Sequence, residues 1–177
     1  MTQPDLLPFA ARAPAPRPAP SHRFDPKEYK VIALRECPTG TPYLEDPEKA
    51  AAYWREHIPA CPYFNPAVEH LVVLLLNTRR RVLGHALVAA GTLDMILLDP
   101  RDVFRPPLVA SAAAIILTHN HPSGDPTPSA ADITVTRQLI KAGEILKVAV
   151  LDHIVMGHPQ QPDCAPWCSL RSLGYFN

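Results

Sequence analysis

The sequence predicts one α/β domain preceded by a proline-rich segment, and three observations point to that class of fold. Its 177 residues match the size of one ordinary domain with a sizeable core. Apolar runs rich in valine, leucine and isoleucine, at 68–76, 114–118 and 148–156, are typical of strands that are covered on both faces. Segments with helix-start signals separate these runs, so we expect helices to pack on a sheet.

The first part of the chain differs in composition from the rest. Residues 1–23 are rich in proline, alanine and arginine without apolar periodicity, and they predict a disordered tail. The tail is interpreted as a spacer, with a ligand for an SH3-like groove as the alternative. Residues 24–65 are expected to form an N-terminal extension, with an edge strand at 29–34 and one short helix that Asp46 caps and Pro47 opens.

The main domain is predicted at residues 66–177, and its elements follow from local patterns. A polar turn at 77–81 separates two strands, and an Asp-Pro pair at Asp99 opens a short helix. Ser129 opens a longer helix, which we expect to end near Gly143. In chain order, the expected elements are strands at 68–76 and 82–90, the short helix, a strand at 114–118, the longer helix, and a strand at 148–156.

Composition and charge argue against several classes of function. Lysine and arginine total 17, aspartate and glutamate total 17, and the formal net charge is zero. A general electrostatic attraction to nucleic acid or to an anionic membrane is therefore not encoded, although a local basic patch stays open. No apolar stretch approaches the roughly 18 residues of a membrane span, and no signal-peptide pattern opens the chain. We expect a cytoplasmic protein without a membrane partner.

The four cysteines are predicted to be free thiols; they are Cys37, Cys61, Cys164 and Cys168. The Cys-x3-Cys spacing of the last two is not a usual redox motif, and no second pair completes a zinc site. Metal ligation and a disulfide are the alternatives.

Two histidines that follow the run at 114–118 are the candidate metal ligands. Because side chains alternate along a strand, His119 and His121 are expected on the same face, with Cα atoms about 6.5 to 7 Å apart. Imidazole nitrogens and carboxylate oxygens bind zinc, and a catalytic zinc site has three protein ligands and one open position. Asp132, in the first turn of the next helix, is the candidate third ligand, because the intervening loop can fold that helix start over the strand end.

Two further polar residues fit the chemistry of a metal-activated water. Glu69 is a carboxylate in a run that is otherwise mostly valine and leucine, where burial is costly unless the group is paired or functional. We interpret it as the general base, with a carboxylate at the exposed start of a strand as the alternative. Ser129 is interpreted as a hydrogen-bond donor to an oxyanion, with a helix cap as the alternative, and one serine can do both.

The pattern His119-x-His121, seven residues, then Ser129-x-x-Asp132, with Glu69 upstream, resembles the JAMM motif of the JAB1/MPN/Mov34 (MPN-plus) metalloproteases. The letters LTHNHPSGD around the histidines resemble specifically the bacterial RadC branch of that family, in a form without its N-terminal helix-hairpin-helix region. This combination of spacing and letters is highly specific.

The resemblance covers about residues 66–176 and implies both a fold and a set of roles. The implied fold is cytidine deaminase-like, a mixed β-sheet sandwiched by helices with the metal site at a strand end. One Zn²⁺ per chain is the implied cofactor. By the resemblance, the family's site residues map onto the zinc ligands His119, His121 and Asp132, the general acid/base Glu69 and the oxyanion-stabilising Ser129.

The activity that the resemblance implies is zinc-dependent hydrolysis of a peptide or isopeptide bond. The expected substrate is a peptide or a protein, and a ubiquitin-like protein stays open as the target. Full-length RadC proteins carry a helix-hairpin-helix region of a kind associated with DNA, whereas this sequence shows a proline-rich tail and one short helix. The alternatives are a DNA-repair-associated or nucleic-acid-processing protein, and a non-catalytic interaction module stabilised by the metal. The oligomeric state is not predicted.

The remaining polar residues receive structural interpretations. Asp152 and His153 match the family but belong to another strand than the motif, so we expect them to form structural hydrogen bonds. His70 points to the face opposite that of the preceding glutamate and is not expected to bind the metal. His85 and His158 have no ligand-like partner in the sequence.

Overall fold

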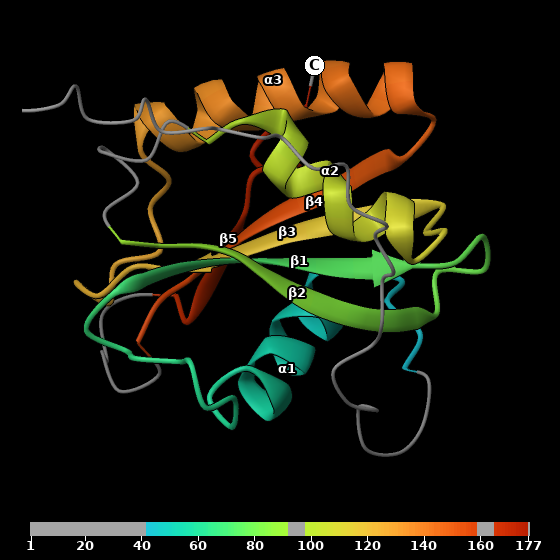
Figure 1. Ribbon diagram of the computed structural model, residues 1–177. Helices are drawn as coiled ribbons and strands as arrows, with labels where there is room; N and C mark the ends of the chain where they lie inside the picture. Colours follow the sequence, from blue (N-terminus) through green and yellow to red (C-terminus); the bar gives the residue numbers. More distant parts are fainter. Residues whose placement is uncertain (1–41, 92–97, 159–164, 177) are drawn as a thin grey trace, which may run out of the picture. The chain divides into compact units, whose positions relative to one another are not determined.

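A five-stranded mixed sheet with helices on both faces forms the centre of the fold (Figure 1). The computed structural model describes residues 42–91, 98–158 and 165–176, all of which belong to one compact unit. The strands are β1 (Glu69–Leu76), β2 (Val82–Gly91), β3 (Ala114–Asn120), β4 (Ala149–Met156) and β5 (Trp167–Ser169). In the order β2-β1-β3-β4-β5, β3 and β4 are parallel and the other neighbours antiparallel. The predicted α/β class and mixed sheet are confirmed.

Each helix begins directly after a capping side chain. The helices are α1 (Pro47–His57) after Asp46, α2 (Pro100–Val109) after Asp99, and α3 (Ala130–Leu146) after Ser129. In α1 and α2 the aspartate accepts a hydrogen bond at 2.8 Å from a backbone N–H group of the first turn, and proline occupies the first helical position. The three predicted helix starts are confirmed.

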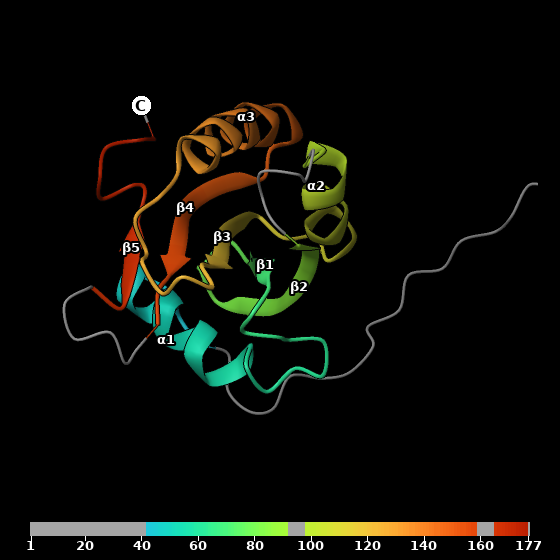
Figure 2. The ribbon, with the colours of Figure 1, turned by 90° about the vertical axis from the view of Figure 1, so that its left-hand side faces the viewer.

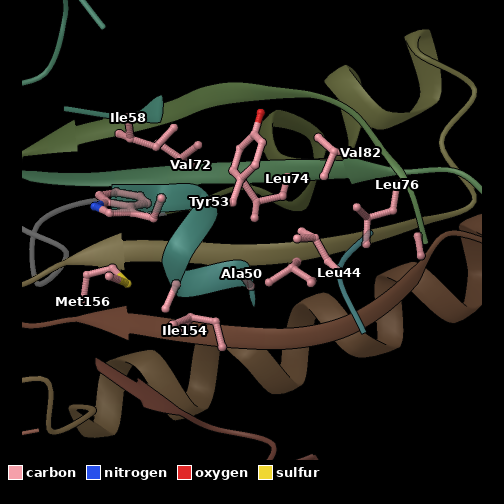
Figure 3. Packing of buried hydrophobic residues seen from close by; sticks show 14 residues of the cluster. Leu44, Ala50, Tyr53, Ile58, Val72, Leu74, Leu76, Val82, Ile154 and Met156 are labelled. Atoms are coloured by element: carbon pink, nitrogen blue, oxygen red, sulfur yellow. The ribbon is translucent and has the colours of Figure 1, made fainter. Parts of the chain in front are cut away.

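α1 packs against one face of the sheet. Figure 3 shows Tyr53 of α1 and Ile58, the residue that directly follows α1, beside Val72 and Leu74 of β1, and all four side chains are buried. Removal of such apolar surface from water is the main favourable contribution to folding. α1 lies within 24–65, the segment that the sequence sets apart as an extension, and it contributes to the same core as the strands.

α2 and α3 cover the other face of the sheet, as the view in Figure 2 shows. Leu139 of α3 packs with Leu71 of β1 and Leu117 of β3 in a second buried cluster. Because side chains alternate along a strand, this face continues at one end of the sheet into Glu69 of β1 and His119 of β3. An apolar layer therefore supports the polar residues predicted to form the site.

α3 extends about one turn beyond its predicted end near Gly143 and finishes at Leu146. A Cβ atom on Gly143 would lie 2.5 Å from the carbonyl oxygen of Val148. Glycine therefore allows the residue that precedes β4 to approach the helix, and it does not end the helix. Lys147 ends it, because this residue adopts the left-handed conformation with φ 58° and its N–H donates to the carbonyl of Gly143.

β4 contains one residue more than the matching part of β3. Ile115 pairs with Val150, and two residues later Leu117 pairs with His153, three residues beyond Val150. Leu151 is the extra residue of this β-bulge. The bulge changes the alternation of β4, so that His153 shares the α3 face with Leu117.

Some sequence predictions lie outside the described residues: the tail at 1–23, the strand at 29–34, Cys37 and Cys164. The domain boundary at residue 66 stays a prediction. Cys61 and Cys168 have free thiols, as expected. In the parts of the chain that the structure describes, no helix combines the length and the apolar character needed to cross a membrane.

Candidate metal centre

The three predicted metal ligands come together where β3 ends and α3 begins. His119 lies in β3, His121 directly follows the strand, and Asp132 lies in the first turn of α3. The loop at 122–128 turns back immediately, because the N–H of Gly124 donates to the carbonyl of His121 at 2.9 Å. This turn brings the beginning of α3 over the end of β3.

The ligand atoms of these residues face one another at distances that suit a tetrahedral ion. His119 Nε2 lies 3.0 Å from His121 Nε2 and 3.4 Å from Asp132 Oδ1. His121 Nε2 lies 3.6 Å from Asp132 Oδ2. Ligands bound at about 2.0–2.1 Å to a tetrahedral zinc ion lie about 3.3 Å from one another. The donor set therefore fits an ion of that size, and among the described residues it is the group with this property.

His121 presents Nε2 because its other ring nitrogen is already in a hydrogen bond. Nδ1 lies 2.7 Å from the carbonyl oxygen of Asp125, which can only accept, so Nδ1 carries the proton. In the neutral ring, Nε2 then holds the lone pair that a metal requires. Interaction with Asp132 raises the pKa of His121, while burial opposes this effect. A metal therefore competes with a proton at this nitrogen.

His119 is fully buried and contacts a second buried histidine. Its Nδ1 lies 2.8 Å from Nε2 of His153. Burial, and then the neighbouring His153, lower the pKa of His119 well below its usual range. Burial also lowers the pKa of His153 to about 4. Both rings are therefore neutral at pH 7, which is the state in which His119 can bind a metal.

A capping box orients Asp132. Its Oδ2 accepts hydrogen bonds at 2.7 Å from both the backbone N–H and the hydroxyl of Ser129, which leaves Oδ1 directed at His119. Burial alone would raise the pKa of Asp132, but the neighbouring His121 and His119 and the Ser129 hydrogen bonds lower it well below its usual range. The helix-cap interpretation of Ser129 is confirmed. Its oxyanion role stays a prediction, because its hydroxyl donates to Asp132 here.

Glu69 is the first residue of β1 and is partly exposed, so the expectation of a carboxylate inside the strand is wrong in this respect. The pairing of β1 with β3 begins only at Leu71 and His119, which leaves the strand start open to solvent. Because side chains alternate along a strand, Glu69 is on the same face of β1 as Leu71, the residue that pairs with His119. Its charge contributes to the raised pKa of His121. Its role as general base stays a prediction.

Asn120, between the two histidines, holds the start of β1. Its Oδ1 accepts a hydrogen bond from the backbone N–H of His70, and its Nδ2 donates to the carbonyl of Val68, both at 3.0 Å. These bonds fix the backbone on both sides of Glu69 relative to β3. Sequence analysis did not single out Asn120, because the central residue of a His-x-His pattern gives no signal of such a contact.

Asp152 and His153 both form buried hydrogen bonds, as expected, but His153 also adjoins the metal centre. Asp152 accepts hydrogen bonds from the Ser169 hydroxyl at 2.7 Å and from the backbone N–H of Arg171 at 3.1 Å, and burial raises its pKa. It thereby joins β4 to the C-terminal part of the described chain. The contact of His153 with His119 depends on the bulge in β4, which the residue pattern does not reveal.

A mixed α/β sheet that carries a His-x-His pair at a strand end and an aspartate on the following helix has the arrangement of a JAB/MPN domain. The chain belongs to the RadC-like JAB domain family, whose sequence model matches residues 44–174. The matched region includes α1 as well as the sheet. The family predicted from the motif is confirmed.

Relatives from three organisms carry the name UPF0758 protein. The one from Desulforamulus reducens is 52% identical over 106 residues, which are 60% of this chain and 44% of the relative. That from Moorella thermoacetica is 55% identical over 89 residues, or 50% and 39% of the two chains. That from Shouchella clausii is 39% identical over 142 residues, or 80% and 57%. The chain thus spans about half the length of the curated relatives it matches.

Proposed function

We propose that this protein is a zinc-dependent hydrolase that cleaves a peptide or isopeptide bond. The observation that carries the proposal is the convergence of His119 Nε2, His121 Nε2 and the Asp132 carboxylate, with the carboxylate of Glu69 on the strand opposite. Three protein ligands leave a fourth position of a tetrahedral ion for a water or a substrate, which distinguishes catalytic from structural zinc sites.

His119, His121 and Asp132 would hold the ion. When bound, zinc supplies a Lewis acid that polarises a carbonyl group and makes a water molecule more acidic. The chain's contribution is to keep the His119 imidazole neutral and the Asp132 carboxylate ionised. The hydrogen bond to the Asp125 carbonyl fixes the ring of His121, and the hydrogen bond from the Ser129 backbone N–H fixes the carboxylate of Asp132.

Glu69 would manage the proton of the reaction. Hydrolysis adds OH to the carbonyl carbon and H to the departing nitrogen, so one group must take a proton from water and return it to the amine. Two observations support this role: Glu69 is on the same face of β1 as Leu71, which pairs with His119, and Asn120 holds the backbone on both sides of Glu69. Ser129 would exchange its hydrogen bond to Asp132 for one to the developing oxyanion.

The substrate would be a peptide or a protein, and a ubiquitin-like protein is a candidate target. The net charge of zero argues against sequence-independent binding of nucleic acid, which depends on many phosphate contacts. Association with DNA repair and a non-catalytic interaction module are the competing functions. Strong, salt-dependent DNA affinity would favour the first of these, and zinc binding without any hydrolysis would favour the second.

The test compares Glu69→Gln with Glu144→Gln, a matched change at an exposed position of α3. Zinc-loaded proteins would be assayed on a panel of peptides and of ubiquitin-like isopeptide conjugates. Turnover should fall about 10²- to 10⁴-fold in Glu69→Gln, while zinc content and melting temperature stay unchanged. Glu144→Gln should behave like the wild type. Undiminished turnover in folded, zinc-loaded Glu69→Gln protein would refute the mechanism.

A further inference from the structure

A buried chain of hydrogen bonds runs behind the candidate metal centre. His119 Nδ1 lies 2.8 Å from His153 Nε2, and His153 Nδ1 lies 2.6 Å from Thr136 Oγ1. Thr136 Oγ1 lies 2.6 Å from the backbone carbonyl oxygen of Asp132. The three side chains of this chain are at most 2% exposed, so water does not substitute for any member. The chain starts at one candidate ligand and ends on the backbone of another.

The donor and the acceptor of each of these hydrogen bonds can be assigned in turn, starting from the Asp132 carbonyl. The Asp132 carbonyl can only accept, so the hydroxyl proton of Thr136 is used there. Thr136 Oγ1 must then accept from Nδ1–H of His153. A neutral His153 has its lone pair on Nε2, which accepts from Nδ1–H of His119. This order leaves the lone pair of His119 on Nε2, the atom that faces His121 and Asp132.

We propose that His153 and Thr136 are positioning residues that fix His119 as its Nδ1–H tautomer and thereby tie two metal ligands together. The proposal rests on the metal-binding part of the proposed function and does not depend on hydrolysis. Hydrogen bonds to the second nitrogen of a metal-binding histidine orient the ring, and their loss typically lowers metal affinity by about 10- to 100-fold.

The bulge in β4 supports this role for His153. In a regular strand, with Leu151 paired opposite Ile116, His153 would pair with Thr118 and would point to the α1 face. With the bulge, His153 pairs with Leu117 and lies on the α3 face, between His119 and Thr136. Bulges are frequent beside functional sites, where they redirect one side chain.

The surroundings of these hydrogen-bonded side chains argue against packing as their sole role. His153 lies on the face where Leu117 and Leu139 form an apolar cluster. An apolar side chain there would avoid the cost of burying polar groups, which is recovered only when each group has a partner. All the polar side-chain atoms buried in the described residues do have partners. An apolar residue at His153 or Thr136 could not supply this ordered series of donors and acceptors.

The experiment uses two substitutions at Thr136 with a control on the same helix. Thr136→Val keeps the shape and removes the hydroxyl, and Thr136→Ser keeps the hydroxyl. Thr134→Val is the matched control, because Thr134 makes the same kind of bond, to the Ala130 carbonyl at 2.8 Å, on the exposed side of α3. Zinc affinity would be measured by competition with a chelator. The His119 tautomer would be determined from ¹⁵N NMR shifts of zinc-free protein.

We expect Thr136→Val to lose roughly 10- to 100-fold in zinc affinity and to show His119 partly protonated at Nε2. Thr136→Ser and Thr134→Val should stay close to the wild type. At His153, the hydrogen-bond neighbour of Thr136, the variant His153→Gln retains an acceptor and should bind zinc better than His153→Leu.

Wild-type affinity and an unchanged His119 tautomer in folded Thr136→Val protein would overturn the proposal, as would an Nε2–H tautomer of His119 in the wild type. Zinc binding that depends on Thr136 in a protein without hydrolytic activity would support the positioning role. That last result would refute the proposed enzyme function but not the positioning role of Thr136.

Discussion

Two pairs of the described histidines, His119 with His121 and His70 with His85, use the imidazole ring differently. In the metal centre, His119 and His121 each place Nδ1 in a hydrogen bond and turn Nε2 towards the other ring, at 3.0 Å. On the α1 face, the Tyr53 hydroxyl lies 2.9 Å from Nδ1 of His85, and the Cys61 sulfur lies 3.5 Å from its Nε2. There, both ring nitrogens contact neighbouring side chains.

His70, the second residue of β1, resembles His85 in that both of its ring nitrogens contact neighbouring polar atoms. Its Nδ1 lies 2.8 Å from the carbonyl oxygen of Val68 and its Nε2 3.2 Å from that of Tyr63. As the sequence predicts, it lies on the face opposite to the metal centre. His70 is as buried as His119, at 2% and 0% exposed, so burial does not separate the two kinds. The two kinds of histidine differ in whether one ring nitrogen lies close to the potential metal-binding atoms of other residues, as in His119 and His121.

The largest effect that would test this comparison is loss of metal. His121→Ala removes one of three candidate ligands, so zinc should fall from about one ion per chain to almost none. His85→Ala should keep the zinc and lose about 1–3 kcal/mol of stability, because the Tyr53 hydroxyl loses a partner. Metal analysis and thermal unfolding of both variants provide the check. Equal zinc content in the two would erase the distinction between the regions.

A second, smaller effect concerns pH. A ligand histidine must lose its proton to bind zinc, and the raised pKa of His121 means that protons compete there already above its ordinary value of 6.5. The lowered pKa of His119 means that it adds no such competition. Zinc affinity should therefore fall about tenfold per pH unit below the His121 pKa, with one proton displaced per ion. Chelator competition between pH 5 and 8 measures the slope. A flat profile, or a two-proton slope near pH 6, contradicts this assignment.

The smallest effect is expected at Asn120, which joins the two regions by bonding to the backbone of His70 from between the ligands. Asn120→Ala should cost about 1–3 kcal/mol of stability. It should also lower turnover by up to about 10²-fold through displacement of Glu69, with zinc retained. Asn77→Ala is the control, because the Asn77 side chain also makes two hydrogen bonds to the backbone, accepting both, at 2.9 and 3.0 Å, in the turn at the other end of β1. Equal losses of turnover in both variants would show a general effect of stability.

The sequence allowed prediction of most elements because their signals are local. Asp-Pro pairs mark the starts of α1 and α2, and continuous apolar runs mark β1 and β3. β5 was not predicted, because it is three residues long and shows no periodicity. The end of α3 was misplaced, because Gly143 leaves room for Val150 of β4 and Phe104 of α2, whose approach depends on tertiary structure.

The candidate site was predictable to the extent that its residues are close in sequence. The convergence of His119, His121 and Asp132 followed from strand alternation and a short loop. The partners behind them did not, because the contact of His153 with His119 needs a β-bulge that shifts the alternation by one residue. Likewise, no local pattern indicates that Asn120 would bond to the backbone of another strand.

The separation of the site residues along the chain has a consequence for how the site assembles. The three candidate ligands fall within residues 119–132, on one strand, one loop and the first turn of one helix. Closing so short a loop costs little chain entropy, so this part forms with local contacts. Glu69 reaches the same place only when β1 pairs with β3, which joins residues about fifty positions apart. The metal ligands are therefore a local assembly, whereas the general base depends on the whole sheet.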